Sequence, residues 1–285
     1  LKNSFGSFMN ILNFGDCIIN GDYKLHSKFK NVHNYINNKH LVSLVSAKVG
    51  TGPNNIVLNR FPQQAEKTLK ISNSKILFGN HTLKVNTIKP KNTSNIYIDN
   101  SFVLISSIEI LIKNISSKVS PQSLGFLLFP KNDIFFQTTF EKAFRSHVKN
   151  TCRSISLEKL PEIAKNLKGA GFGLTPSGDD FNCGVLYALN YLNEIMSNDF
   201  SEIIEECYQN SITNNSISNT FLKFAYSNKY YENFHQLLLA LKQNKLETIT
   251  HYANKIIGSG HTSGSDMLTG FIVTIKGVLN DKKFS

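Results

Sequence analysis

Two short glycine-rich segments carry the residues best suited to chemistry. The first, "GAGFGLTPSGDDFNCG" at 169–184, places glycines, hydroxyls and two adjacent carboxylates ahead of an apolar run. The second, "GSGHTSGSDMLTGFIVTI" at 258–275, also has a glycine-rich approach and a Ser-Gly-x-Asp step before an apolar run, with the single carboxylate of Asp266. Four positions correspond between the copies: Ser177 with Ser263, Gly178 with Gly264, Asp180 with Asp266, and Gly184 with Gly270. This repetition predicts two similar helices whose N-terminal ends lie side by side.

Helix capping is one interpretation of both segments. A serine followed three residues later by aspartate resembles a capping box, so Ser177 would pair with Asp180 and Ser263 with Asp266. Each glycine four residues beyond the aspartate lies on the same helix face and lets another backbone approach closely. Capping alone therefore explains part of the pattern.

Ligand binding is the second interpretation, and the sequence favours it. The additional glycines cost backbone entropy that a simple cap does not require. Free N–H groups at a helix start carry partial positive charge and bind anions, so two adjacent starts would form an anion site fringed with hydroxyls. The candidate substrate-binding residues are Gly171, Gly173, Thr175, Ser177, Gly178, Gly260, Thr262, Ser263 and Gly264.

Proton transfer within such a site would fall to its carboxylates or its histidine. Asp179 and Asp180 point about 100° apart on a helix, so one could cap while the other faces the ligand. The candidate catalytic residues are Asp179, Asp180, His261 and Asp266. Paired carboxylates raise one another's pKa or hold a hard cation. The sequence identifies no definite cofactor, and Mg²⁺ is the candidate metal.

The elements that would position these residues change in character along the chain. Short β-branched or alternating runs, separated by Gly, Asn and Pro, predict strands within residues 40–49, 54–61, 74–85, 95–101 and 102–107. Between two of these runs, "VGTGP" at 49–53 predicts a tight hairpin-type turn in preference to a ligand loop.

From about residue 141 the apolar residues recur at three- and four-residue steps. This period predicts helices within 140–150, 156–167, 183–196, 200–212, 218–227, 231–243 and 246–257. Strands followed by helices indicate an α+β fold, with a β-rich lobe over 1–140 and a mostly helical lobe over 141–285 that carries both glycine-rich segments. The boundary near residue 140 has an uncertainty of about ten residues.

Composition limits the function classes. The net charge of +11 comes from lysines scattered among asparagines, so a solvated surface is favoured over nucleic-acid binding. No apolar run is long enough to span a bilayer, and the first residues lack the pattern of a signal peptide. Four cysteines lie far apart without zinc-ligand spacing, so we expect reduced thiols and a cytoplasmic protein with no membrane partner.

The two motifs also resemble a known family. "GLTPSGDDF" at 173–181 with "GHTSGSDMLTG" at 260–270 is similar to the AllH family, as are residues 41–58 and 214–225, in the same order. In place of Phe172 the family often has proline, and near Ala170 it is sometimes basic. The resemblance implies a subunit of oxamate carbamoyltransferase acting beside an acyl-CoA-synthetase-like subunit and a third subunit.

The implied reaction exchanges a carbamoyl group between oxalurate and phosphate, giving oxamate and carbamoyl phosphate during allantoin and purine catabolism. The leading hypothesis is a carbamoyltransferase-type subunit that binds phosphate, carbamoyl phosphate or oxalurate at the two helix starts. The alternative is a non-catalytic subunit whose same loops bind or scaffold a partner.

Overall fold

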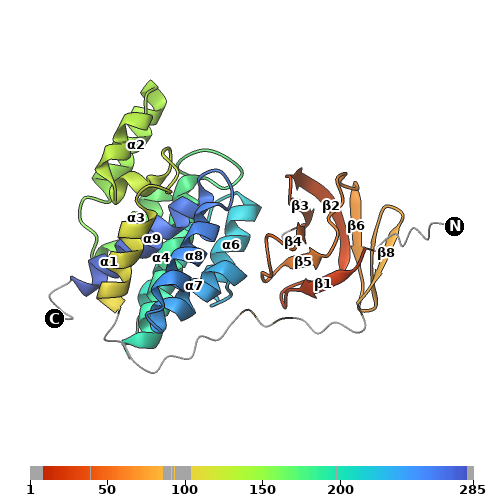
Figure 1. Ribbon diagram of the computed structural model, residues 1–285. Helices are drawn as coiled ribbons and strands as arrows, with labels where there is room; N and C mark the ends of the chain where they lie inside the picture. Colours follow the sequence, from red (N-terminus) through yellow and green to blue (C-terminus); the bar gives the residue numbers. More distant parts are fainter. Residues whose placement is uncertain are drawn as a thin grey trace. The chain divides into compact units, whose positions relative to one another are not determined.

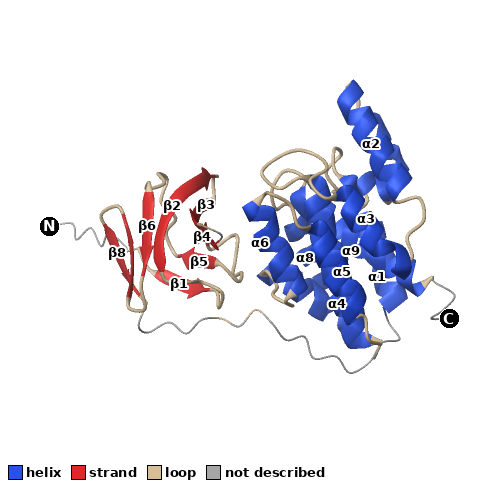
Figure 2. Ribbon diagram, turned by 180° about the vertical axis from the view of Figure 1, so that it is seen from behind, coloured by secondary structure: helices blue, strands red, loops and turns tan. Residues whose placement is uncertain are grey.

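The computed structural model describes residues 9–38, 40–85, 91, 93, 104–196 and 198–280. The chain divides into two compact units, one of Leu1–Asn95 with Lys229–Glu232, and one of Ile96–Asn228 with Asn233–Ser285. The strands gather in the first unit and the helices in the second (Figures 1 and 2). The predicted α+β fold, β-rich first and helical afterwards, is confirmed.

The first unit is an eight-stranded sheet in the order β1-β5-β4-β3-β2-β6-β7-β8. Its neighbouring strands are antiparallel except for the parallel pair β4 and β5. The strands are β1 Ile11–Phe14, β2 Gly21–Lys28, β3 Val32–Asn37, β4 His40–Ser46, β5 Asn55–Leu58, β6 Thr68–Ile71, β7 Lys75–Phe78 and β8 His81–Lys84.

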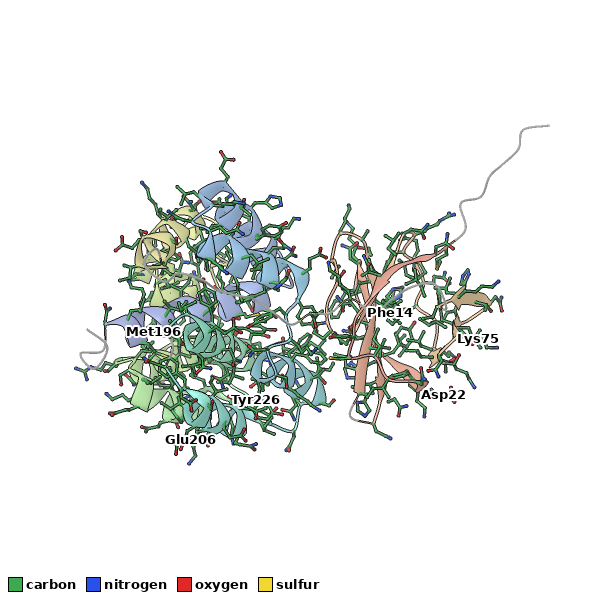
Figure 3. The ribbon with its side chains drawn as sticks, turned by 90° about the horizontal axis from the view of Figure 1, so that it is seen from below. Phe14, Asp22, Lys75, Met196, Glu206 and Tyr226 are labelled. Atoms are coloured by element: carbon green, nitrogen blue, oxygen red, sulfur yellow. The ribbon has the colours of Figure 1, made fainter. Side chains whose placement is uncertain are left out.

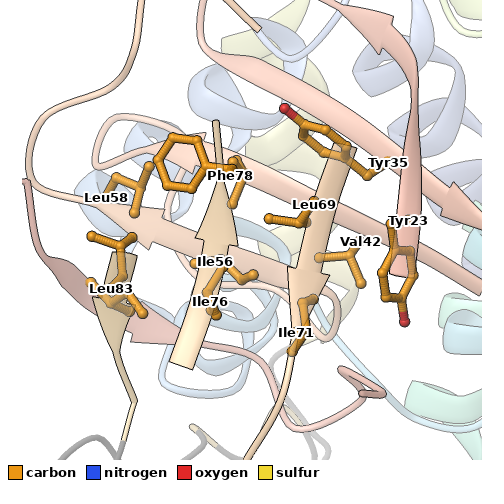
Figure 4. Packing of buried hydrophobic residues seen from close by; sticks show 12 residues of the cluster. Tyr23, Tyr35, Val42, Ile56, Leu58, Leu69, Ile71, Ile76, Phe78 and Leu83 are labelled. Atoms are coloured by element: carbon orange, nitrogen blue, oxygen red, sulfur yellow. The ribbon is translucent and has the colours of Figure 1, made fainter. Parts of the chain in front are cut away.

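Alternating residues of these strands build the core of the sheet unit. In β6, Leu69 and Ile71 are buried while their neighbours Thr68 and Lys70 are exposed, because successive side chains of a strand point to opposite faces. Polar side chains such as those of Asp22 and Lys75 lie on these strands (Figure 3). The buried cluster takes residues from each of these strands, from Ile11 in β1 to Leu83 in β8, and Figure 4 shows its packing.

The loop between β4 and β5 differs from its prediction, because a hairpin would require antiparallel strands and these are parallel. Residues Lys229–Glu232, which belong to the sheet unit, hold the loop instead. The Glu232 carboxylate accepts the N–H of Thr51 at 2.8 Å, and the Tyr231 hydroxyl donates to Asn54 Oδ1 at 2.7 Å. A contact so distant in sequence is invisible to a local turn rule.

The remaining strand predictions have mixed outcomes. The segments within 40–49, 54–61 and 74–85 contain strands, as predicted: β4, β5, and β7 with β8. The hairpin turn that divides the last segment into two strands was not predicted. Residues 95–101 lie outside the described residues. The strand predicted at 102–107 is wrong, since Leu104 already begins helix α1. The run "LISSIEILIKNI" is rich in isoleucine, and its helical period becomes visible only over its full length.

The second unit contains helices throughout its described length. They are α1 Leu104–Ile115, α2 Thr139–Thr151, α3 Leu160–Leu167, α4 Ser177–Ile195, α5 Ser201–Ser211, α6 Ser216–Tyr226, α7 Glu232–Lys242, α8 Leu246–Ile257 and α9 Ser263–Leu279, with short 3₁₀ turns η1 Leu124–Leu127, η2 Pro130–Phe135 and η3 Leu157–Lys159. All seven helical segments predicted from periodicity contain a helix. Helical structure nevertheless begins at Leu104, before the boundary expected near residue 140.

Helices α4 and α9 form the centre of this unit, with other helices around them (Figure 1). Every residue of α4 from Ser177 to Leu192 is buried, and so is most of α9. Such all-round burial is typical of a core helix. None of the described helices is long and apolar enough to cross a bilayer. The four cysteines, all within the described residues, form no disulfide bond.

Candidate functional site

The two motifs meet because α4 and α9 pack backbone to backbone. A Cβ placed on Gly184 would lie 2.0 Å from the carbonyl oxygen of Met267, and one on Gly270 would lie 2.2 Å from that of Phe181. No side chain fits at such separations, so each glycine admits the opposite helix. The close approach expected for this pair of glycines is therefore observed.

Each motif also packs in the same way against the helix that precedes it. The N–H of Gly178 donates to Ala170 and that of Gly264 to Ser259, at 2.8 and 3.1 Å. A Cβ on Gly178 would meet the carbonyl of Leu167 at the end of α3, and one on Gly264 would meet that of Ile256 near the end of α8. The sequence repeat is thus a structural repeat: helix, glycine-rich loop, core helix.

The starts of the two core helices touch through hydroxyl groups. Thr175 Oγ1, in the loop before α4, lies 3.2 Å from Ser263 Oγ at the start of α9. The same Thr175 hydroxyl donates to Asp180 Oδ2 at 2.9 Å. Burial raises the pKa of Asp180, and the Ser263 hydroxyl offsets part of that rise. Hydroxyls from both motifs therefore meet at one carboxyl group.

The capping boxes predicted within each motif are wrong. Pro176 and Thr262 occupy the N-cap positions, and neither makes a side-chain capping hydrogen bond. The serine hydroxyls interact across the helix pair instead. Burial raises the pKa of both aspartates, and the hydroxyl of Ser263 offsets part of that rise for Asp180, as the hydroxyl of Ser177 does for Asp266. Each of these two aspartates therefore interacts with the serine hydroxyl of the opposite motif.

Asp180 and Asp266 lie together and are buried, with exposed fractions of 3% and 0%. Burial, followed by the negative charge of Asp266, raises the pKa of Asp180 well above its usual range. Burial raises the pKa of Asp266 to about 7, although its Oδ1 accepts the N–H of Leu124 at 2.6 Å. The Asp266 carboxyl group can therefore hold a proton near neutral pH, and the pKa of Asp180 is shifted in the same direction.

Asp179, the residue before Asp180 in α4, is also buried. Its Oδ1 accepts the N–H of Gly169 at 2.6 Å, and burial raises its pKa. The Ser218 hydroxyl lies close enough to lower that pKa. Even so, neither Asp179 Oδ2 nor Ser218 Oγ forms a hydrogen bond of normal geometry within the described chain. Asp179 Oδ2 and the Ser218 hydroxyl could therefore form hydrogen bonds with a ligand beside the first glycine-rich loop.

Two further elements contribute residues that sequence reasoning missed. Asn215 caps α6 by accepting the N–H of Ile217, and its Nδ2 donates to the carbonyl of Leu174 at 2.8 Å. This brings the start of α6, with Ser218, to the first loop. Asn215 before a helical run was a readable cap signal. Nothing local in the sequence linked Leu124 to Asp266.

The predicted residues divide into a buried and an accessible set. Ser177, Gly178 and Gly264 are buried with the three aspartates, while Thr175, Thr262 and Ser263 are half-buried. Gly173, Gly260 and His261 are exposed. The backbone N–H groups of 172–175 and 260–262 donate to no acceptor in the described parts of the chain. The accessible set therefore consists of hydrogen-bond donors: the hydroxyls of Thr175, Thr262 and Ser263 and the backbone N–H groups of 172–175 and 260–262. These donors are called the rim below, and the carboxyl groups of the three aspartates are buried beneath them.

Metal binding is not supported by this donor set. The described residues contain no group of three or more His, Cys, Asp or Glu side chains that could hold a metal ion. The accessible residues of the rim are hydroxyl and N–H donors, which suit an anion better than a cation.

The fold and the site together define an α+β protein whose helical unit pairs two glycine-rich helix starts over buried aspartates. A family model described as "Oxamate carbamoyltransferase subunit AllH" matches residues 167–275, from the end of α3 into α9. The match covers both motifs and confirms the resemblance to the AllH family over this segment. No curated protein and no solved structure matches the chain.

Proposed function

We propose that this protein is a subunit of an oxamate carbamoyltransferase-type enzyme that binds its anionic substrate at the two paired helix starts. The contact between Thr175 and Ser263 carries the proposal, because it joins the two motifs at Asp180 within the segment that the family model matches. The reaction would convert oxalurate and phosphate into oxamate and carbamoyl phosphate.

Substrate binding would use the accessible donors of the rim. The backbone N–H groups of the two loops, with the hydroxyls of Thr175, Thr262 and Ser263, would donate to phosphate or carboxylate oxygens. The buried carboxyl groups beneath would repel an anion if all were ionised. Their raised pKa values reduce that repulsion, because a protonated carboxyl group carries no charge.

Carbamoyl transfer would require one proton as well as a stabilised oxyanion. A phosphate oxygen attacks the ureido carbonyl carbon of oxalurate; the new C–O bond forms and the C–N bond to oxamate breaks. The N–H groups of the rim would stabilise the oxyanion. The departing amide nitrogen takes up a proton, supplied by His261 at the surface, by Asp179, or by Asp180 through the hydroxyls of Thr175 and Ser263. The proton that hydrogen phosphate loses as it becomes carbamoyl phosphate restores that donor, so the reaction needs no net proton.

Ligand binding can be tested on the isolated chain by thermal shift. Phosphate, carbamoyl phosphate and oxalurate should each raise the melting temperature, since a ligand at a hundred times its dissociation constant stabilises by about 2.7 kcal/mol. Nucleotides serve as the comparison. A response to nucleotides alone would contradict the proposed substrate class.

Catalysis requires the acyl-CoA-synthetase-like and third subunits that the family resemblance implies. In the assembled complex, Asp179→Asn and His261→Gln should each reduce carbamoyl phosphate formation by about a hundredfold or more if that residue transfers the proton. His26→Gln, on an exposed position of β2, is the matched control. Asn at 179 retains an acceptor for the Gly169 N–H, so folding should be nearly unchanged.

One observation favours the alternative of a non-catalytic subunit. All three aspartates are at most 3% exposed, so they could serve only to hold the two loops together. Full activity of both Asp179→Asn and His261→Gln, in a complex that still requires the chain, would support this binding or scaffold role.

A further inference from the structure

Asp179 and Ser218 place two buried hydrogen-bond acceptors next to each other. Both residues are 1% exposed, and the Ser218 hydroxyl is close enough to offset part of the rise that burial causes in the pKa of Asp179. Asp179 Oδ1 accepts the N–H of Gly169, whereas Asp179 Oδ2 and Ser218 Oγ form no hydrogen bond of normal geometry with the described residues. These two atoms are called the acceptor pair below. A buried polar atom without a partner costs free energy that a ligand donor would recover.

The start of α6 connects the acceptor pair to the rim. The Asn215 side chain accepts the N–H of Ser218 at 3.2 Å, which fixes the first turn of α6. The same side chain donates to the carbonyl of Leu174 at 2.8 Å. Thr175, the next residue of the first glycine-rich loop, belongs to the rim. A small ligand on the rim can therefore extend to the acceptor pair.

The first glycine-rich loop leaves room for such a ligand. Gly169, whose N–H binds Asp179, is exposed, and a Cβ built on it would have no atom within 4 Å. A Cβ on Gly173 would find its nearest neighbour at 3.7 Å, an ordinary contact. Because no described side chain packs against the loop at these two positions, its backbone can shift to admit a small ligand.

The second motif shows which donors suit this place in the repeat. The alignment of the motifs pairs Asp179 with Ser265, whose Oγ accepts the backbone N–H of Ser120 at 3.1 Å. The adjacent Asp266 accepts the backbone N–H of Leu124. Peptide N–H groups of the chain thus occupy the second motif, whereas α6 brings only a hydroxyl to Asp179 Oδ2 in the first. The amide of a ligand would supply the missing N–H donor.

We propose that the acceptor pair binds the terminal NH₂ of a carbamoyl group, so that the protein recognises its substrate by an amide as well as by an anion. The inference rests on the proposed function, which places a phosphate or carboxylate on the rim. A carbamoyl NH₂ has two N–H donors, one for Asp179 Oδ2 and one for Ser218 Oγ. An ionised carboxylate only accepts hydrogen bonds, and a donor at Oδ2 favours that ionised form.

This assignment makes Asp179 and Ser218 specificity residues for the transferred group. The carbamoyl NH₂ is present in oxalurate and in carbamoyl phosphate, so the same contacts would hold it before and after transfer. An Asp179 that accepts hydrogen bonds from the substrate is not the proton donor, which leaves His261 or Asp180 for that step.

The test compares two acyl phosphates that differ in this group alone. Carbamoyl phosphate has the NH₂, and acetyl phosphate has a methyl group of similar size in its place. Calorimetry on the full-length chain, at low temperature to slow hydrolysis, should show carbamoyl phosphate binding at least about tenfold more tightly, because the methyl group leaves a buried carboxylate unpaired. Inorganic phosphate measures binding to the rim alone.

Asp179→Asn should abolish this preference. The asparagine Oδ1 can still accept the Gly169 N–H, which turns the Nδ2 donor toward the NH₂ of the ligand. Carbamoyl phosphate should then bind at least about tenfold more weakly than it binds the wild type. Phosphate and acetyl phosphate should bind at least as tightly as before, since a negative charge has been removed. A loss of structure would instead weaken all three ligands.

Ser218→Ala should reduce the preference about fivefold, the value of a hydrogen bond between neutral groups. Ser216→Ala is the matched control, because Ser216 lies two residues earlier and about 200° around α6. This variant should keep the preference of the wild type. Circular dichroism checks that all three variants fold.

The outcomes separate the acceptor pair from the proposed function. If the wild type binds phosphate without preferring carbamoyl phosphate to acetyl phosphate, the acceptor pair is overturned and the anion site stands. The same holds if Asp179→Asn or Ser218→Ala keeps the preference in full. If the wild type binds none of the three ligands, the acceptor pair and the proposed anion site are both overturned.

Discussion

At the scale of single residues, the main feature of the site is that two aspartates, Asp180 and Asp266, are buried close together. Asp180 and Asp266 share their surroundings with hydroxyls from both motifs, and burial raises the pKa of each. The pKa of Asp266, about 7, lets this carboxyl group hold a proton near neutral pH, which is the property a proton donor needs.

The raised pKa of Asp266 predicts how stability depends on pH. The folded state keeps a proton that the unfolded chain releases near pH 4, so the contribution of this group is fully present below that pH and is lost as pH rises through about 7. Chemical denaturation between pH 5 and 8 should show stability falling with pH, by up to about 1.4 kcal/mol per unit from this group.

Asp266→Asn should reduce that slope. The asparagine Oδ1 can still accept the Leu124 N–H, and it has no charge to bury. The exposed Asp22→Asn on β2 should leave the slope unchanged (Figure 3). An identical pH dependence in Asp266→Asn and the wild type would show that Asp266 is ionised in both states.

At the scale of elements, the glycine contacts between α4 and α9 predict a large and specific loss of stability. Gly184→Ala and Gly270→Ala place a methyl group about 2 Å from a backbone carbonyl oxygen, so the helices must separate. We expect each to lower the free energy of unfolding by about 3 kcal/mol, at the upper end of overpacking effects.

Gly258→Ala is the control for this prediction. Gly258 ends α8 with φ −73°, and its nearest neighbour would be an ordinary 3.4 Å from the new Cβ. Denaturant melts should therefore show little change. Equal stability of all three variants would mean that α4 and α9 do not approach as closely as described.

The elements also show what local sequence could and could not predict. Seven helical segments and strand structure within 40–49, 54–61 and 74–85 followed from periodicity and turn residues. The repeat in the two motifs predicted adjacent helix starts. The capping boxes were wrong because the serine hydroxyls act on the opposite motif, a choice made by tertiary packing. Leu124 contacts Asp266, and Ser218 lies beside Asp179. Both pairs are far apart in the sequence, so local patterns could not predict them either.

At the scale of the whole molecule, contacts distant in sequence define the two units. Lys229–Glu232 lie between α6 and the body of α7, yet pack with the sheet unit, where Lys229 pairs with Asp16 at 2.6 Å and Tyr230 donates to Thr93. The composition of the sequence does not change at Lys229–Glu232, so nothing in it indicates that this segment belongs to the sheet unit. The sequence therefore predicted a single boundary near residue 140.

The net charge of +11 leads to a prediction about nucleic acids. Because the lysines are dispersed, we expect no binding to random duplex DNA at moderate ionic strength. A fluorescence anisotropy titration over salt concentration measures this. Binding that persists, with a steep linear dependence of log affinity on log salt, would contradict the prediction and reopen a nucleic-acid function.

The central claim is that the two glycine-rich motifs form one anion site. A double-mutant cycle of Thr175→Val and Ser263→Ala, read out as phosphate affinity by calorimetry, tests it most directly. Each single variant should lower affinity at least about tenfold, the value of a hydrogen bond to a charged group. The double variant should lose less than the product of the two, with a coupling of at least about 0.5 kcal/mol. Unchanged affinity, or losses that multiply without coupling, would contradict a shared site.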